Sequence, residues 1–225
     1  MQRIEAIIFD KDGTLFDFQK TWTRPFGRLM EDVAPDRRAA AAHVLGFDMQ
    51  SNRFHPDSVV IASTTGEVAE VLKPFFDGDH AATVARLNAA GSTATQQPAV
   101  QLRPCLEALA AERYLGLVTN DSETPARAHL AQENIADLFT FIAGWDSGYG
   151  AKPEPGQLLA FCEITGISPA ATIMVGDSRH DLMAGRAAGM GTVGVLTGVA
   201  GETDLADLAD VVLPDIGHLA GWLDG

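Results

Sequence analysis

Residues 4–14 read IEAIIFDKDGT, a short apolar run that ends in two aspartates and a glycine. Such a run is typical of a buried strand in a parallel sheet that is covered on both faces. Residues 114–118 (YLGLV) and 172–175 (TIMV) have the same character, and residues 192–196 and 211–213 are two further strand-like segments. Helical patterns separate these runs, and one of them, at residues 125–133, is expected to have Thr124 as its N-cap and Pro125 at its first position. The alternation predicts an α/β fold with a parallel sheet.

This alternation is interrupted after the first strand. Three helical patterns lie in the interrupting stretch, at residues 35–45, 67–72 and 81–90. Gly46 is expected to end the first of these helices, and the polar residues 91–97 are typical of a linker. We therefore predict an all-helical unit at residues 18–97. The core would consist of residues 1–17 and 98–225.

The chain has 225 residues, with 16 Lys and Arg against 30 Asp and Glu and a net charge of −14. This length suits one core with a smaller appended unit, as a monomer or a small homo-oligomer. The acidic excess argues against nucleic acid or an anionic membrane as a partner. No apolar run approaches the roughly 20 residues of a membrane-spanning helix, and no secretion signal is evident. We expect a cytoplasmic protein with two free, buried cysteines, Cys105 and Cys162.

Asp10 and Asp12 follow the first predicted strand directly, and Gly13 turns the chain after them. Ligands of parallel sheets bind at the carboxyl ends of the strands, where these side chains lie. Two carboxylates so close together should have different pKa values. One can then act as a nucleophile or metal ligand, while the other keeps a proton and acts as a general acid. The alternative is an ordinary Asp-Gly turn.

A second acidic pair follows the strand at residues 172–175. Asp177 comes after the glycine, and Asp181 comes about one helical turn later. Carboxylate oxygens at a strand end suit Mg²⁺, which is usually bound by one or two carboxylates, water and substrate phosphate. The alternative is that both aspartates cap the next helix, where they favour its positive N-terminus.

Thr119, Asn120 and Lys152 add polar groups to the same predicted edge. Thr119 and Asn120 end the strand at residues 114–118 and carry donors that suit a phosphate oxygen. Lys152 lies in the segment GAKPEP, where prolines stiffen the backbone, and its charge would offset nearby acids and phosphate. Ordinary turn polarity and a solvated lysine are the alternatives.

Four segments of the chain resemble, in order, the four motifs of the haloacid dehalogenase-like (HAD) hydrolase superfamily. They are Asp-x-Asp-Gly-Thr (10–14), Thr-Asn (119–120), Lys-Pro (152–153) and Gly-Asp-Ser-x-x-Asp (176–181). The resemblance spans nearly the whole chain and is strongest to phosphoglycolate phosphatase-like members. It implies a Rossmann-like core of three layers around a parallel sheet. It also implies a helical cap inserted after the first motif.

The resemblance implies a Mg²⁺-dependent phosphatase that acts on a small phosphorylated metabolite. Asp10 would attack phosphorus and form an aspartyl-phosphate, and Asp12 would protonate the leaving alcohol and then activate water. The phosphate-binding residues would be Thr119, Asn120 and Lys152. The magnesium site would consist of Asp10, the backbone carbonyl of Asp12, Asp177 and, in a supporting position, Asp181.

Two other functions remain open. A phosphosugar mutase similar to β-phosphoglucomutase shares these motifs but returns the phosphoryl group to the sugar. A phosphate-binding or Asp-phosphorylated signalling module also combines strand-end acids with Thr and Lys. The acid at Asp12 favours phosphate esters over halide substrates, because the dehalogenases that the chain resembles have no acid there.

Several further residues have less definite roles. Lys11 occupies a position where relatives more often carry an apolar residue, and we expect it to face a polar pocket without an assigned role. Trp22 and Phe26 are expected to pack between cap and core. Arg24, Arg38 and Arg53 are candidates to hold a second anionic group of a substrate. Surface or capping positions are predicted for the six histidines: His43, His55, His80, His129, His180 and His218.

Overall fold

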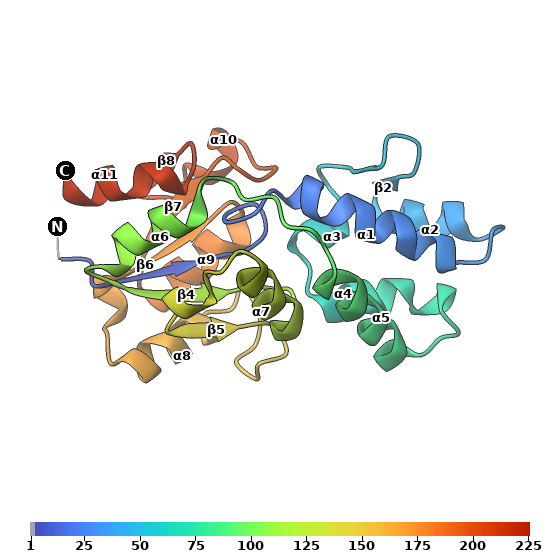
Figure 1. The fold of residues 1–225 in the computed structure, drawn as a ribbon, viewed down its shortest axis with the longest axis horizontal. Coiled ribbons are helices and arrows are strands. Elements are labelled where there is room, and N and C mark those ends of the chain that lie inside the picture. Colours follow the sequence, from blue (N-terminus) through green and yellow to red (C-terminus); the bar gives the residue numbers. More distant parts are fainter. Residues whose placement is uncertain (1–2) are drawn as a thin grey trace.

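A computed structural model describes residues 3–225 of the chain (Figure 1). Its main sheet has six strands in the order β5-β4-β1-β6-β7-β8, and every neighbouring pair is parallel. The strands are β1 (Ala6–Phe9), β4 (Tyr114–Val118), β5 (Phe141–Ala143), β6 (Thr172–Gly176), β7 (Gly191–Val195) and β8 (Val211–Leu213). The predicted parallel sheet is therefore confirmed. The three-residue β5 was not predicted, because so short a run has no readable period.

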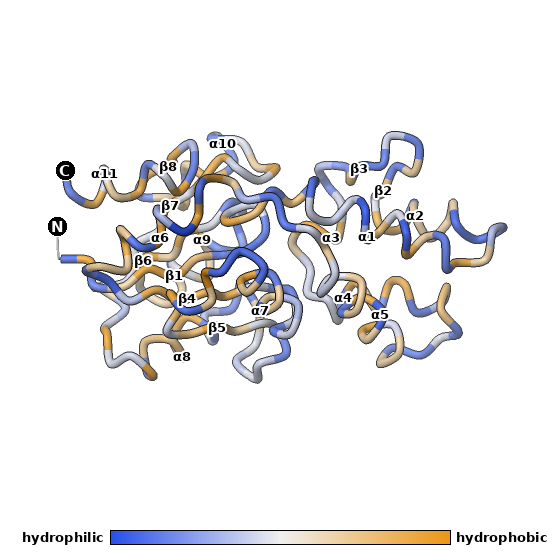
Figure 2. Tube along the Cα trace, in the orientation of Figure 1, coloured by the Kyte–Doolittle hydropathy of each residue, from blue (hydrophilic) through white to orange (hydrophobic). Residues whose placement is uncertain are grey.

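The strands are hydrophobic because helices cover both faces of the sheet (Figure 2). In β1, Ile7 and Phe9 pack into the cluster on one face, while Ala6 and Ile8 pack into the cluster on the other. The first face is covered by α6 (Leu102–Ala110), α7 (Glu123–Gln132) and α11 (Leu219–Asp224). The second is covered by α8 (Gly156–Thr165) and α9 (Arg179–Ala188). A short α10 (Glu202–Leu205) packs near α9. The result is the expected three-layer, Rossmann-like core.

The register of the sheet places the candidate residues at one edge. Phe9 of β1 lies opposite Leu117 of β4 and Val175 of β6. Asp10, Thr119 and Asp177 follow these three residues by one or two positions. All of these strands run the same way, so their polar ends meet at the carboxyl edge of the sheet.

The inserted unit lies at one end of the core, on the right in Figure 1, and has its own hydrophobic cluster. Its helices are α1 (Phe18–Asp32), α2 (Arg38–Leu45), α3 (Val59–Ala62), α4 (Thr65–Leu72) and α5 (His80–Ser92). As predicted, Gly46 ends α2 in the left-handed conformation, with a φ of 64°. The unit also contains an antiparallel pair, β2 (Phe47–Asp48) with β3 (Arg53–Phe54). It is therefore helical apart from this short pair, which is too short to recognise in the sequence.

The two segments that join the insertion to the core lie side by side. The main-chain N–H of Asp17 donates to the carbonyl of Gln97 at 2.9 Å, and Phe16 forms an antiparallel bridge with Pro98. The chain therefore enters and leaves the insertion at one place.

Three smaller expectations concern helix caps, cysteines and membrane segments. Ser122, and not Thr124, is the N-cap of α7, so the proline lies inside the first turn. Cys105 and Cys162 are both free thiols; Cys162 is buried, whereas Cys105 is half-buried. Among the helices of residues 3–225, none has the length and apolar character needed to cross a membrane.

Candidate active site

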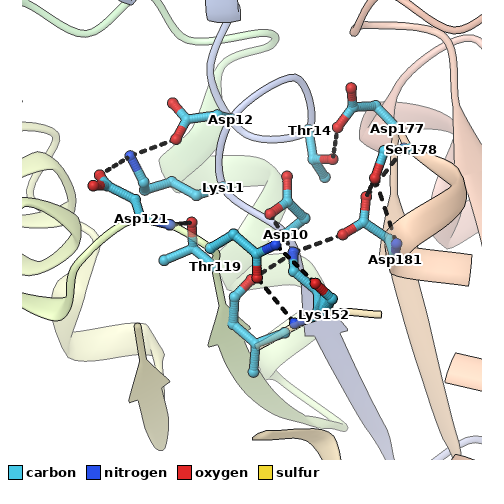
Figure 3. Close-up of polar contacts among 12 residues, drawn as sticks. Asp10, Lys11, Asp12, Thr14, Thr119, Asp121, Lys152, Asp177, Ser178 and Asp181 are labelled. Carbon is cyan, nitrogen blue, oxygen red and sulfur yellow. Dashed lines mark hydrogen bonds and ion pairs between the residues drawn. The ribbon is translucent and has the colours of Figure 1, made fainter. Parts of the chain in front are cut away.

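Three buried carboxylates meet at the carboxyl edge of the sheet. Asp10 follows β1, Asp177 follows β6, and Asp181 lies in the first turn of α9. One oxygen from each lies within 4.8 Å of the others (Figure 3). Ser178 is the N-cap of α9, and Asp181 completes a capping box with it. Asp177 therefore does not cap the helix and is available to the site, contrary to the capping alternative.

The ammonium group of Lys152 partly balances these acids. Its Nζ donates to Asp10 Oδ1 and Asp181 Oδ1, both at 2.6 Å, and to the carbonyl of Val118 at 3.2 Å. All three N–H groups are thus used within the site. Burial acts to lower the pKa of Lys152, but Asp10 and Asp181 outweigh this effect and raise its pKa. Lys152 is therefore a fixed positive charge next to Asp10.

The acids still carry more negative charge than Lys152 can balance. Burial raises the pKa of Asp10 to about 7, against the lowering effect of Lys152. Burial also raises the pKa of Asp177 well above its usual range, and the charges of Asp10 and Asp181 add to this rise. Asp12 does not share the contact with Lys152 and lies beside a different cation, described below.

The residues present fit a magnesium ion. The donors are carboxylate oxygens, which Mg²⁺ prefers, and three of them meet beside a single ammonium group. Thr14 Oγ1 donates to Asp177 Oδ1 at 3.3 Å and helps to orient it. A Cβ added at Gly13 or Gly198 would come within 2.3 Å or closer of Asp177, so only glycine leaves room for this carboxylate. Asp10, Asp177 and Asp181 are the side chains that would hold the ion.

Lys11 forms the second charge cluster of the site. Its side chain is fully buried, with Nζ at 2.7 Å from Asp12 Oδ2 and at 3.0 Å from Asp121 Oδ2 (Figure 3). Burial acts to lower the pKa of Lys11, but the two carboxylates raise it overall. Lys11 does face a polar environment, as expected, and the structure now identifies its partners.

This cluster joins the core to the inserted unit. Trp22 Nε1 of α1 donates to Asp12 Oδ1 at 2.7 Å. Lys11 Nζ also lies 2.9 Å from His129 Nδ1, and His129 Nε2 lies 2.8 Å from the carbonyl of Gly91 in α5. Both contacts are satisfied by a neutral His129 protonated on Nε2. The prediction of a surface or capping position was wrong for His129, because its partners come from distant segments.

Thr119 and Asn120 follow β4. Thr119 is free to make the predicted phosphate contact, whereas Asn120 has a different role. Thr119 Oγ1 accepts the main-chain N–H of Asp121 at 3.1 Å, which leaves its hydroxyl hydrogen free for a phosphate oxygen. The Asn120 amide instead donates to the carbonyls of Ala62 and Lys152, both at 2.9 Å, and accepts Lys152 N–H at 3.0 Å. Its side chain has no donor left, so the structure does not support the predicted phosphate contact from this amide. Asn120 positions the Lys152 loop.

Asp121 was missed by the sequence interpretation. Its Oδ1 accepts from Thr65 Oγ1 of α4 at 3.1 Å, and its Oδ2 pairs with Lys11. Burial raises the pKa of Asp121, with Lys11 acting in the opposite direction. Its position directly after Thr119 and Asn120 at a strand end was the available signal.

A cavity of about 700 Å³, open mouth included, lies between the core and the insertion. Asp10, Asp12, Thr119, Lys152 and Asp177 line it from the core. Trp22 and Phe26 line it from α1 and also pack in the cluster of the insertion. The candidate residues therefore line one cavity.

The family model for haloacid dehalogenase-like hydrolases matches residues 4–189, which include all of these acids and Lys152. The chain belongs to this family. It is accordingly an enzyme of the hydrolase class. A phosphoglycolate phosphatase of Rhodospirillum rubrum is 30% identical over 228 residues, covering 97% of this chain and 90% of the relative.

Solved structures of other HAD proteins share the fold. One is a Bacillus subtilis protein with the provisional designation of HAD hydrolase. Its structure is described as bound to magnesium and as revealing interdomain movement. It is 18% identical, with a TM-score of 0.71 over 100% of both chains. Another, from Thermotoga maritima, is provisionally designated a β-phosphoglucomutase. It is 18% identical, with a TM-score of 0.68 over 98% of this chain and 99% of that one. Identities this low show a common fold alone.

Mg²⁺ is expected to raise the melting temperature of this HAD hydrolase, because it would bind the buried acids of the folded state. At a concentration 100 times its Kd the gain is about 2.7 kcal/mol. Differential scanning fluorimetry of the wild type and Asp177→Asn measures the effect. Asp177→Asn should lose most of the shift, while the exposed Asp36→Asn keeps it. An equal shift in Asp177→Asn would refute the proposed ligand set.

Lys11→Met is expected to destabilise the protein by about 3–5 kcal/mol, because it leaves Asp12 and Asp121 buried without their cation. Urea denaturation measures this loss. Lys20→Met is the matched control, since its exposed pair with Asp17 should contribute at most about 1 kcal/mol. Adding Asp121→Asn to Lys11→Met should restore part of the stability. A Lys11→Met protein as stable as Lys20→Met would contradict this account.

His129 is expected to make stability depend on pH. Burial, together with Lys11, lowers the pKa of His129 to about 4, so the unfolded chain binds the proton more readily. Its contribution is full above pH 6.5 and is lost as the pH falls toward 4, by up to about 3 kcal/mol. Denaturation curves from pH 7 to 4 should be flatter for His129→Gln than for the wild type. The exposed His218→Gln should follow the wild type, and parallel curves for all three would exclude the effect.

Proposed function

We propose that this HAD hydrolase is a Mg²⁺-dependent phosphomonoester hydrolase that forms a phosphoryl intermediate on Asp10. One observation carries the proposal. Asp10 Oδ1 is bound to Lys152 at 2.6 Å, while Oδ2 has no hydrogen bond within residues 3–225 and belongs to a side chain that lines the cavity. A carboxylate oxygen held next to a fixed cation is suited to attack a phosphorus atom.

In the first step, Asp10 Oδ2 forms a bond to phosphorus while the ester bond to the alcohol oxygen breaks. Lys152 lies beside the attacking group and offsets the negative charge of the transferred phosphoryl group. The hydroxyl of Thr119 donates to one phosphoryl oxygen. Asp12 delivers a proton to the departing alcohol oxygen, since it lines the same cavity two residues after the nucleophile.

In the second step, Asp12 takes a proton from water, which attacks phosphorus and releases phosphate from Asp10. The contacts from Lys11 and Trp22 fix the position of the Asp12 carboxyl group, which suits this role. Asp12 must leave part of this arrangement to carry a proton to the alcohol. A bound magnesium ion would neutralise charge on the phosphoryl oxygens and on Asp10, Asp177 and Asp181.

The relationship to the phosphoglycolate phosphatase of Rhodospirillum rubrum supports hydrolysis of a small organic phosphate. The position of the acids in a cavity between the core and the insertion also suits a small ester better than a phosphoprotein. A phosphosugar mutase would have the same phosphorylated aspartate. An isomerised sugar phosphate with little free phosphate would identify that activity, and a stable aspartyl-phosphate without turnover would identify a signalling module.

Asp10→Asn is expected to reduce phosphate release by at least about 10³-fold, because the amide cannot form the phosphoryl intermediate. Release of phosphate from a panel of small esters with Mg²⁺ measures the effect. Asp36→Asn, at an exposed position outside the cavity, should keep full activity. An Asp10→Asn variant as active as Asp36→Asn would rule out the mechanism.

A further inference from the structure

The walls of the active-site cavity differ in chemistry. The wall formed by the core carries the carboxylates and Lys152. The wall formed by the insertion is largely apolar and also carries two small hydroxyl groups, those of Ser63 and Thr65. Its apolar side chains come from α1, α3, α4 and α5 and include Phe18, Trp22, Phe26, Val60, Ile61 and Leu87.

The arginines of the insertion do not contribute to this wall. Arg24 lines a separate cavity, which is formed by α1 and by residues 86–95. Arg38 donates to the carbonyls of Val33 and Glu31, and Arg53 lies on the exposed side of β3. Within residues 3–225, the cavity is lined by two side chains able to carry positive charge, Lys152 and His180. All three N–H groups of Lys152 are already used.

A second anionic group on the substrate would therefore be poorly accommodated. Directed toward the insertion, it would lose its hydration against aromatic and aliphatic side chains. Directed toward the end of β4, it would approach Asp12 and Asp121, whose charges repel it. His180 lies on α9, on the core side of the cavity. The core side of the cavity thus suits the charged phosphate group of a substrate, and the insertion side suits an apolar group.

We propose that the substrate is the phosphate monoester of an apolar alcohol, without a second anionic group. This inference rests on the proposed phosphatase activity and specifies its substrate class. The phosphate end would occupy the charged wall, and the hydrocarbon part would lie against Trp22, Phe26 and Ile61. Hydrolysis would consume one water, break the ester bond and release a neutral alcohol and inorganic phosphate.

The n-alkyl phosphates from ethyl to pentyl test this substrate class, since their leaving groups have nearly equal reactivity. With Mg²⁺ present, kcat/KM should rise about threefold for each added methylene, as expected for burial of apolar surface. Ethyl phosphate and phosphoglycolate form a matched pair, in which the terminal methyl group of ethyl phosphate is replaced by the carboxylate of phosphoglycolate. Ethyl phosphate should have a kcat/KM at least about 10-fold higher. Constant kcat/KM along the series, or a preference for phosphoglycolate, would overturn the proposal.

Two variants locate the effect in the insertion. Ile61→Ser places a polar group on the apolar wall and should reduce the dependence on chain length to about twofold or less per methylene. Val44→Ser is the control, because Val44 is exposed on α2 and does not line the cavity. An unchanged dependence in Ile61→Ser would overturn the placement of the hydrocarbon part.

Measurements of ligand affinity test the proposed substrate class independently of the proposed phosphatase activity. If no ester releases phosphate, the phosphatase activity is refuted. The affinities of non-hydrolysable n-alkylphosphonates, measured by calorimetry with Mg²⁺, then decide the substrate class. Affinity that increases with chain length supports an apolar site, and affinity that is equal along the series overturns it.

Discussion

The arrangement of the site depends on one buried ammonium group, that of Lys152. Asp10, Asp177 and Asp181 come from the ends of two strands and the start of α9, and they lie close together in a place with little water. Their mutual repulsion would separate them without a cation. Lys152 lies on the loop that follows β5, and its Nζ is 2.6 Å from an oxygen of Asp10 and 2.6 Å from an oxygen of Asp181. Burial, with the neighbouring carboxylates, raises the pKa of Asp10 and of Asp177. Three carboxylates beside one ammonium group leave an excess of negative charge that suits a divalent ion.

Lys11 repeats this arrangement on the side that faces the insertion. It balances Asp12 and Asp121, and Trp22 and the carbonyl of Gly91 extend the network into α1 and α5. The half of the site that would hold the metal is built by the core alone. The half that contains the proposed acid and base is built by core and insertion together. Movement of the insertion would therefore change the surroundings of Asp12 more than those of Asp10.

The same division extends to substrate recognition. The motif residues all lie on the charged wall, which would bind the phosphoryl group that every substrate of a phosphatase shares. The apolar wall comes from residues between 18 and 87, a stretch without any of the four motifs. Reaction chemistry and substrate choice are thus carried by different parts of the chain. This separation explains how a conserved reaction can be combined with a different alcohol.

The sequence by itself determined the parallel sheet, the inserted helices and the strand-end positions of Asp10, Thr119 and Asp177, because apolar runs and the residues that end them are local patterns. It missed β5, which has three residues, and placed the α7 cap at Thr124 instead of Ser122. Only the tertiary structure decided that Lys11 meets Asp121 and His129, that the Asn120 amide holds the Lys152 loop, and that no arginine lines the cavity within residues 3–225. These partners are separated by up to 118 residues along the chain, and spacing in a sequence carries no information about which distant groups the packing of two units brings within hydrogen-bonding distance.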